Sequence, residues 1–307
     1  MMGAVSAGGY ESWFVSARDP AGPGALWIRH TMLRPVAGPA SAALWCTVAG
    51  QGGEPVAVKE VFSAFPPEAA AGPGQFRGAA TMAGQRARWD LAVAGGPPPL
   101  RPLRPAVLYR APLPRTKLEV SVPDGLVTGL LEVGGQQIGV DRWRGTVGHN
   151  WGAEHADCWV WLHAAGFGTE PEAWLDLVLA RIKVGPARSP WTAMGALGLA
   201  GELIALGGLG RRSTVSAGPG QLTAAVPAVP GRLDLTVSTG DEDAVTVRYA
   251  DPRGGTRLVR HAARAAVQVR FRRPGHDELT LSGTCGAYEY GTSQPVPGTT
   301  PRPLPEG

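Results

Sequence analysis

Short runs of alternating apolar and polar residues, separated by glycine, proline and other turn residues, recur along the whole 307-residue chain. Runs of this kind have the two-residue period of β-strands, and long runs with the 3.6-residue period of helices are nearly absent. The turn Val133-Gly134-Gly135-Gln136 indicates a hairpin, and Asp251-Pro252-Arg253-Gly254-Gly255 is a second strong turn signal. The pattern therefore predicts an all-β chain of antiparallel strands.

The candidate strands fall into two groups of about nine or ten, which predicts two lipocalin-like antiparallel β-barrel domains. The join is expected between residues 145 and 157, where a glycine-flanked turn holds His149 and Asn150. The expected division is a tail at 1–9, domains at 10–150 and 151–291, and a disordered proline-rich tail at 292–307. A barrel of this size can hold one small ligand, and two barrels also leave a cleft between them.

Composition and charge exclude several classes of function. With 44% hydrophobic residues the chain can bury a sizeable core, which argues against general disorder. Lys and Arg total 29 against 25 for Asp and Glu, but the basic residues are scattered and lack interleaved aromatic side chains. A solvated surface is therefore favoured over a nucleic-acid groove.

The three cysteines, Cys46, Cys158 and Cys285, are widely spaced and match neither a disulfide framework nor a zinc site. They fit a reducing cytoplasm, and residues 1–9 do not have the pattern of a signal peptide. The apolar stretch Met194 to Gly210 is too short and too rich in glycine to span a membrane as a helix. It predicts a glycine-bent strand pair, with an interfacial membrane contact as the alternative.

The densest chemical feature lies near the middle of the chain, where aromatic residues, histidines and an acid gather. Alternation places Trp159, Trp161 and His163 on one face of a strand, and Trp174 and Asp176 on one face of the next strand. Stacked rings stabilise positive charge, and an acid among apolar neighbours must be protonated or paired. This patch is a candidate reaction centre, with Asp176 either a general acid or a structural partner of a nearby Arg or His.

The other candidates each have a functional and a structural interpretation. His149 could set the protonation of the acid, and Trp151 lies two residues after it. Tryptophans in β-proteins are often core residues, so some of those proposed to line a cavity are expected only to pack. The proposed substrate-binding residues are Trp143, Trp159, Trp161, His163, Trp174 and Glu289.

Three further features are predicted to be structural. Glu11 and Arg29 lie on adjacent predicted strands and could form a buried ion pair. The stretch 154–157, with its acids and His155, favours a hydrophilic connector over a metal site because its spacing matches no familiar ligand pattern. No dinucleotide, phosphate or nucleophile motif is present, so neither a cofactor nor a metal is expected. The stretch 95–105 is expected to be a stiff loop.

Four segments, in this order, resemble the hydroxyneurosporene synthase (carotenoid hydratase) superfamily, which also takes in tocopherol-cyclase-like proteins and lipocalin-like Diels-Alderases. The resemblance covers residues 10 to 291. The segments are Tyr10-Glu11-Ser12-Trp13-Phe14, Trp27-Ile28-Arg29-His30-Thr31, Gly148-His149-Asn150-Trp151-Gly152 and Tyr288-Glu289-Tyr290-Gly291.

The resemblance implies two lipocalin-like barrels with a polyene or isoprenoid ligand in or between them, and no cofactor. It also implies that His149 and Trp151, together with Asp176, take part in protonating an alkene. Trp174 stands where the hydratases have a tyrosine, so this chain lacks that phenolic donor. Three functions stay open: hydration or cyclisation of an apolar substrate, a cofactor-independent pericyclic reaction, and non-catalytic binding of a lipid. A purely structural module without a cavity is the remaining interpretation.

Overall fold

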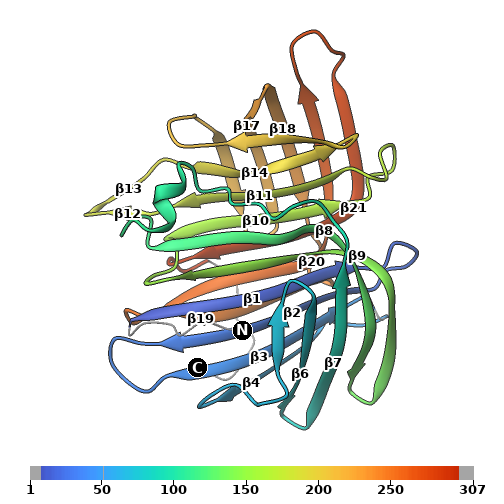
Figure 1. Ribbon diagram of the computed structural model, residues 1–307, viewed down its shortest axis with the longest axis vertical. Coiled ribbons are helices and arrows are strands. Elements are labelled where there is room, and N and C mark those ends of the chain that lie inside the picture. Colours follow the sequence, from blue (N-terminus) through green and yellow to red (C-terminus); the bar gives the residue numbers. More distant parts are fainter. Residues whose placement is uncertain (1–7, 51, 297–307) are drawn as a thin grey trace.

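The computed structural model describes residues 8–50 and 52–296, and they form an all-β structure with one short 3-10 turn, η1 (Ala106–Tyr109). The predicted fold class is confirmed. Two large antiparallel sheets make up most of the molecule, the first mostly in the lower half of Figure 1 and the second mostly in the upper half. Of the predicted tails, residues 1–7 and 297–307 lie outside the described residues. Gly9 and Thr292 belong to strands.

The first sheet has nine strands in the order β4-β3-β2-β1-β9-β8-β7-β6-β5. In the described residues no ladder joins its two edges, although β4 packs against β6. Its strands are β1 (Gly9–Arg18), β2 (Ala25–Arg34), β3 (Ser41–Ala49), β4 (Val56–Phe62), β5 (Ala70–Gly72), β6 (Gln75–Met82), β7 (Gln85–Ala94), β8 (Thr116–Val133) and β9 (Gln136–Gly152).

The second sheet closes into an eight-stranded barrel because β15 pairs with β17 as well as with β14. The first half of β20 pairs with β19 and the second half pairs with β18, so β19 extends beyond the barrel. The strands of this second sheet, including β16 and β19 outside the barrel, are β10 (Cys158–Ala165), β11 (Trp174–Arg181), β14 (Thr192–Leu199), β15 (Glu202–Gly207), β16 (Thr214–Gly218), β17 (Gln221–Val229), β18 (Gly231–Ser238), β19 (Ala244–Ala250), β20 (Thr256–Arg272) and β21 (Leu279–Thr292).

A separate hairpin, β12 (Lys183–Val184) and β13 (Ala187–Arg188), follows β11. The predicted strand pair between Met194 and Gly210 is confirmed as β14 and β15, and the turn at Gly134-Gly135 joins β8 to β9 with both glycines at positive φ. No helix among the described residues has the length and apolar character needed to cross a membrane.

The expected turn at residues 148–152 is wrong, because β9 runs without a break to Gly152. Gly148 is a close-approach position and not a turn position: a Cβ there would lie 2.2 Å from Cζ of Phe14, its partner on β1. The connection to the second sheet is the shorter segment 153–157.

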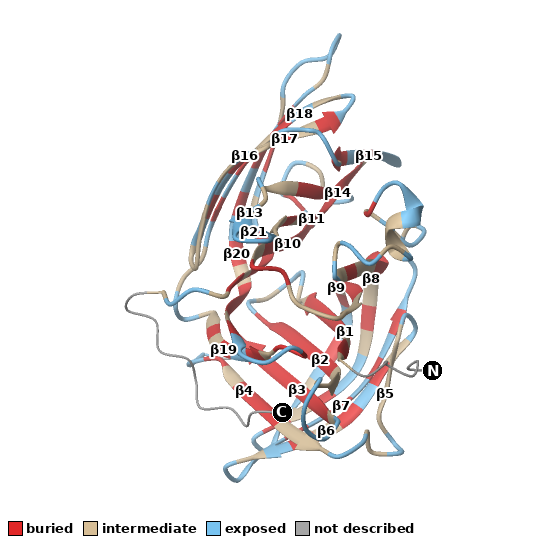
Figure 2. Ribbon diagram, turned by 90° about the vertical axis from the view of Figure 1, so that its left-hand side faces the viewer, coloured by how far each residue is buried: buried red, intermediate tan, exposed pale blue. Residues whose placement is uncertain are grey.

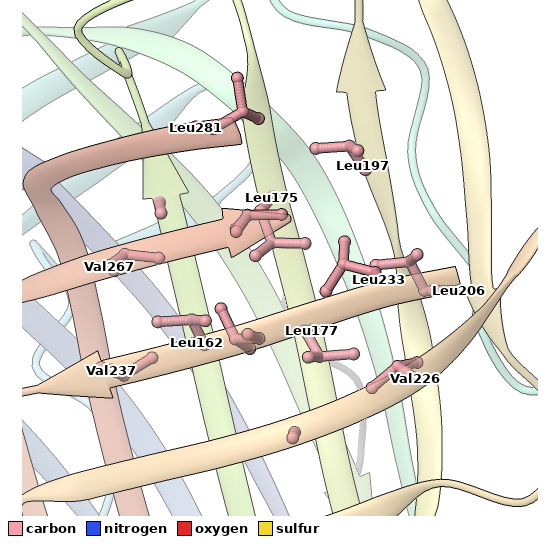
Figure 3. Packing of buried hydrophobic residues seen from close by; sticks show 14 of the residues in the cluster. Leu162, Leu175, Leu177, Leu197, Leu206, Val226, Leu233, Val237, Val267 and Leu281 are labelled. Atoms are coloured by element: carbon pink, nitrogen blue, oxygen red, sulfur yellow. The ribbon is translucent and has the colours of Figure 1, made fainter. Parts of the chain in front are cut away.

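Mainly aliphatic side chains fill the interior of both sheets, and a few aromatic rings join them in the first. The core of the first sheet includes Ile28, Leu44, Phe76 and Trp89, all without solvent exposure. The closed barrel is packed mainly with leucine and valine, among them Leu162, Leu175, Leu177, Leu197 and Val226 (Figure 3). Neither interior therefore matches the predicted aromatic cavity.

A third buried cluster joins the outer faces of the two sheets. Strand β20 contacts β2 and β3, β10 contacts β9, and β11 contacts β8, so the long strands meet at the waist of the molecule (Figure 1). Figure 2 shows that these facing strands are buried along much of their length. The cluster contains Phe14, Trp27, Trp45, Trp161 and Tyr249 with small and β-branched residues. Aromatic side chains therefore gather between the sheets.

Candidate functional site

A cavity of about 370 Å³ lies in this interface between the two sheets. The first sheet contributes residues of β1, β2, β8 and β9, and the second contributes residues of β10, β11, β14, β19 and β21. Leu103, Leu108 and Leu113, from the segment between β7 and β8, complete the wall. Leu113 and Leu209 line the cavity while staying 51% and 59% exposed, which places both at its mouth.

Asp176 on β11 faces this cavity and is 1% exposed. Its Oδ2 atom has no hydrogen-bond partner, and His163 Nδ1 lies 3.6 Å from it. His163 is the cross-strand neighbour of Asp176 on β10, and neither of its ring nitrogens has a hydrogen-bond partner. The carboxyl group therefore faces an apolar space with only a weakly engaged histidine beside it.

Glu289 on β21 lies on the same face, with β10 between it and β11. Its two carboxyl oxygens are occupied: Trp159 Nε1 donates to Oε1 at 2.8 Å, and the Tyr249 hydroxyl donates to Oε2 at 2.9 Å. Burial alone would raise the pKa of Glu289, but His261, Arg29 and the indole N–H outweigh burial and hold the pKa below its usual range. Glu289 is therefore a carboxylate and not a proton donor at neutral pH.

Tyr249 connects this carboxylate to a buried cation. Arg29 on β2 lines the cavity at 6% exposure, and its guanidinium lies 3.8 Å from the centre of the Tyr249 ring. Burial, opposed by Arg29 and reinforced by Glu289, raises the pKa of Tyr249 well above its ordinary value. The phenol therefore stays protonated and continues to donate to Glu289.

One wall of the cavity depends on a glycine opposite an indole. Trp159 pairs with Gly291 across β10 and β21. A Cβ at Gly291 would lie 2.1 Å from Trp159 Cζ2, so only glycine lets the indole lie over β21. The hydrogen bond to Glu289 then fixes the ring at the polar end of the cavity.

His149 and Trp151 lie on the opposite face of β9 from Gly148 and Asn150, which line the cavity. The His149 ring stacks on Trp13 at 3.8 Å and on Trp151 at 4.5 Å, and its Nε2 lies 2.9 Å from Glu11 Oε1. The structure therefore does not bring these two residues together with Asp176.

The remaining predicted substrate-binding residues divide between the cavity and the cores. Trp159, Trp161 and Glu289 line the cavity. Trp143 belongs to the core of the first sheet, and Trp174 packs with Ala165 and Ala196 in a small separate cluster. His163 reaches the cavity only through its contact with Asp176.

Two structural expectations have different outcomes. The ion pair between Glu11 and Arg29 does not form, because the two side chains lie on opposite faces of the sheet. Arg29 lies on the face that carries Ser12 and Phe14. Glu11 lies on the other face, where it contacts His149. The connector at 154–157 is charged and paired, because Glu154 binds Arg115 and Arg257, and Asp157 binds Lys183 and Arg188. No group of potential ligands for a metal occurs in the described part of the chain.

Comparison with known proteins yields no matching family model. The chain is 30% identical over 167 residues to uncharacterized proteins of Mycobacterium tuberculosis strains CDC 1551 / Oshkosh and ATCC 25618 / H37Rv. The match covers 52% of this chain and 50% of each relative, so the chain spans about half the length of the curated relatives it matches.

Several solved structures share the fold over nearly the whole chain. CghA has a TM-score of 0.58 at 12% identity, covering 93% of this chain and 88% of that one. An AttH-type protein of Nitrosomonas europaea has a TM-score of 0.51 at 16% identity, covering 92% of both chains. Kievitone hydratase of Nectria haematococca has a TM-score of 0.51 at 11% identity, covering 92% and 89%. At such identities these neighbours show the fold alone.

Sequence reasoning did not assign cavity roles to Tyr249 or Arg29. Tyr249 is the sixth residue of β19 and faces the cavity only because β19 extends from the barrel and packs against the first sheet. For Arg29 a signal existed, since an arginine directly after the apolar residues Leu26, Trp27 and Ile28 of a predicted strand can be a buried charge. What that charge faces depends on the packing of the two sheets.

Proposed function

We propose that the chain binds a polyene or isoprenoid-type molecule in the cavity between the sheets and hydrates or cyclises it, with Asp176 as the general acid. The observation that carries the proposal is the environment of Asp176, which is buried, lacks a hydrogen-bond partner at Oδ2 and faces an apolar cavity. The fold shared with a hydratase supports the same reaction class. Glu289 differs from Asp176, because both of its carboxyl oxygens accept hydrogen bonds.

The geometry suggests how the proton transfer would proceed. Asp176 donates its proton to a carbon–carbon double bond, which leaves a carbocation on the substrate. The indole face of Trp161, two residues before His163 on β10, stabilises the positive charge. In a hydration, water adds to the cation and gives up a proton to the Asp176 carboxylate. In a cyclisation, an internal hydroxyl adds and loses its proton in the same way, or an internal alkene adds and the new carbocation loses an adjacent proton to that carboxylate.

A reaction in deuterium oxide tests this proposal. Acyclic carotenoids and prenylated quinols are incubated with the wild-type protein, and the products are analysed by mass spectrometry. Proton-initiated chemistry places deuterium on a product carbon, whereas Asp176→Asn is expected to lower turnover by at least about 100-fold with ligand affinity retained. Unchanged turnover in this variant contradicts the acid role.

A cofactor-independent pericyclic reaction is the second candidate, favoured by the separation of His149 and Trp151 from Asp176. Such a reaction needs a shaped cavity that folds the substrate, and no acid. It predicts a product without deuterium, a mild effect of Asp176→Asn and a severe effect of Trp161→Ala. A carrier without catalysis predicts that every bound ligand is recovered unchanged.

A further inference from the structure

Arg29 is a buried cation in the wall of a mostly apolar cavity. It sits in the middle of β2 at 6% exposure, opposite Phe14 in the register. Within the described residues no carboxylate lies within ion-pair distance of its guanidinium. Removing a charge from water without a partner is costly, and a natural protein rarely keeps such a charge without a use for it.

The contacts of Arg29 fix its orientation without satisfying its charge. Nε donates to Ser12 Oγ at 2.6 Å, and the guanidinium plane lies over Tyr249 at 3.8 Å and near Trp45 at 5.8 Å. The hydrogen bond uses one of the five N–H groups of an arginine. Arg29 also lines both the main cavity and a smaller cavity beside it, so its side chain borders open space.

The nearby acids are already engaged with other groups. Glu289 accepts from Trp159 and Tyr249, as described above. Asp251 lies 3.3 Å from Arg257 and 3.4 Å from His155. These carboxylates balance the field of Arg29 at longer range, but neither makes a direct ion pair with it.

We propose that Arg29 binds an anionic oxygen group of the ligand, a carboxylate or an acidic enolate, with Tyr249 holding the guanidinium in place. This inference rests on the proposed function in placing the ligand in this cavity, and it narrows the substrate class. The apolar chain of the ligand then runs past Trp161 toward Asp176. Strand geometry separates the Cα atoms of Asp176 and Glu289 by roughly 10–12 Å, so the cavity wall between these two acids is long enough for such a chain. The substrate is an amphipathic acid and not a pure hydrocarbon.

The test compares two probes that differ only in charge: cis-parinaric acid and its methyl ester, titrated by fluorescence at neutral pH. The wild-type protein is expected to bind the acid at least about tenfold more tightly, as befits a charge-assisted hydrogen bond. Arg29→Gln is expected to abolish this preference and leave affinity for the ester unchanged. Arg270→Gln, an exposed arginine on β20, is the matched control for net charge and keeps the preference.

Two outcomes overturn the inference: equal binding of acid and ester by the wild-type protein, or an undiminished preference in Arg29→Gln. If that variant does not fold, as judged by circular dichroism, Ser12→Ala replaces it, since loss of the Nε contact is expected to weaken the preference several-fold. An undiminished preference in Ser12→Ala then counts against the inference.

The failure of this inference is distinguishable from failure of the proposed function. If both probes bind equally well, the cavity still holds an apolar ligand and only the role of Arg29 is wrong. If neither probe binds, both proposals are contradicted.

Discussion

The interiors of the two sheets and the space between them are built from different side chains. Leucine, valine and alanine dominate the interiors, and the first sheet adds aromatic rings such as Phe76 and Trp89. Between the sheets lie tryptophans, two tyrosines, a buried arginine and three acids. The same strands supply both environments: on β10, Val160 and Leu162 face the barrel interior, while Trp159 and Trp161 face the cavity.

The difference teaches that a closed barrel need not hold the ligand. A barrel interior in which leucine and valine side chains are closely packed leaves no room for a polyene. The outer faces instead provide flat rings and a few polar groups, which is the composition of a small-molecule site. Stability and ligand binding should therefore respond to substitutions on opposite faces of one strand.

The largest effect is expected where adjacent residues of β11 face the two environments. Leu177 is fully buried in the barrel, so Leu177→Ala should lower the free energy of unfolding by about 2–5 kcal/mol and leave the affinity for cis-parinaric acid unchanged. Val178→Ala, on the cavity side, should weaken the affinity for cis-parinaric acid and leave the free energy of unfolding nearly unchanged. Denaturant unfolding and fluorescence titration measure the two quantities, and equal responses would remove the distinction between the faces.

The interior of the first sheet should be sensitive to acid through His30. Burial lowers the pKa of His30 to about 3, and its Nε2 accepts a hydrogen bond from Trp89 Nε1 at 3.2 Å. Below pH 6.5 the His30 imidazole takes up a proton in the unfolded chain but stays neutral in the folded protein. The free energy of unfolding is therefore highest above pH 6.5 and falls as the pH drops toward 3. The expected slope is about 1.4 kcal/mol per pH unit.

The matched variant is His30→Gln, which keeps an acceptor but does not titrate. Urea unfolding at a series of pH values should show a shallower loss of stability for the variant than for the wild-type protein. Parallel curves would mean that His30 does not control the acid response.

A smaller effect is expected from the cavity wall. Trp161 contacts Phe14 edge to face at 5.0 Å between ring centres and lines the cavity. Trp161→Leu should weaken binding of the cis-parinaric methyl ester by about tenfold, because most of an indole's contact area is lost. Trp143→Leu, in the core of the first sheet, serves as the control and should lower stability without changing affinity. Equal affinity in the two variants would count against a ligand between the sheets.

The smallest effect is expected at the edge of the cavity, where the Tyr10 hydroxyl lies 2.7 Å from Thr116 Oγ1. Burial raises the pKa of Tyr10 to about 12, so the phenol stays neutral at physiological pH. Tyr10→Phe should cost about 1 kcal/mol of stability and change affinity less than about threefold. A change of affinity above tenfold would show that this hydroxyl contacts the ligand.

The sequence predicted the elements better than their arrangement. Alternation correctly placed Trp159 and Trp161 on one face of β10, and the strand class and the Gly134-Gly135 hairpin are confirmed. The turn expected at Gly148 was wrong because a glycine can serve close packing as well as a turn, and only the partner strand decides which. Spacing alone could not reveal that Phe14 lies against it.

The candidate site was predictable only where neighbours in sequence are neighbours in space. His163 and Asp176 meet because consecutive strands pair, which a sequence reading can anticipate. His149 was expected beside the acid, yet it points away because a shift of one residue along β9 reverses the face. Tyr249 joins Arg29 through β19, which packs against strands more than 200 residues earlier in the chain, and no local pattern encodes that contact.

Photolabelling tests most directly the claim that ligand binds between the sheets and not inside the barrel. A fatty acid with a diazirine on its chain is bound, irradiated and located by mass spectrometry of the peptides. We expect labels on cavity residues such as Met194 and Tyr249, and their loss on competition with cis-parinaric acid. Competed labels on interior residues such as Leu197 and Val226 would contradict the account.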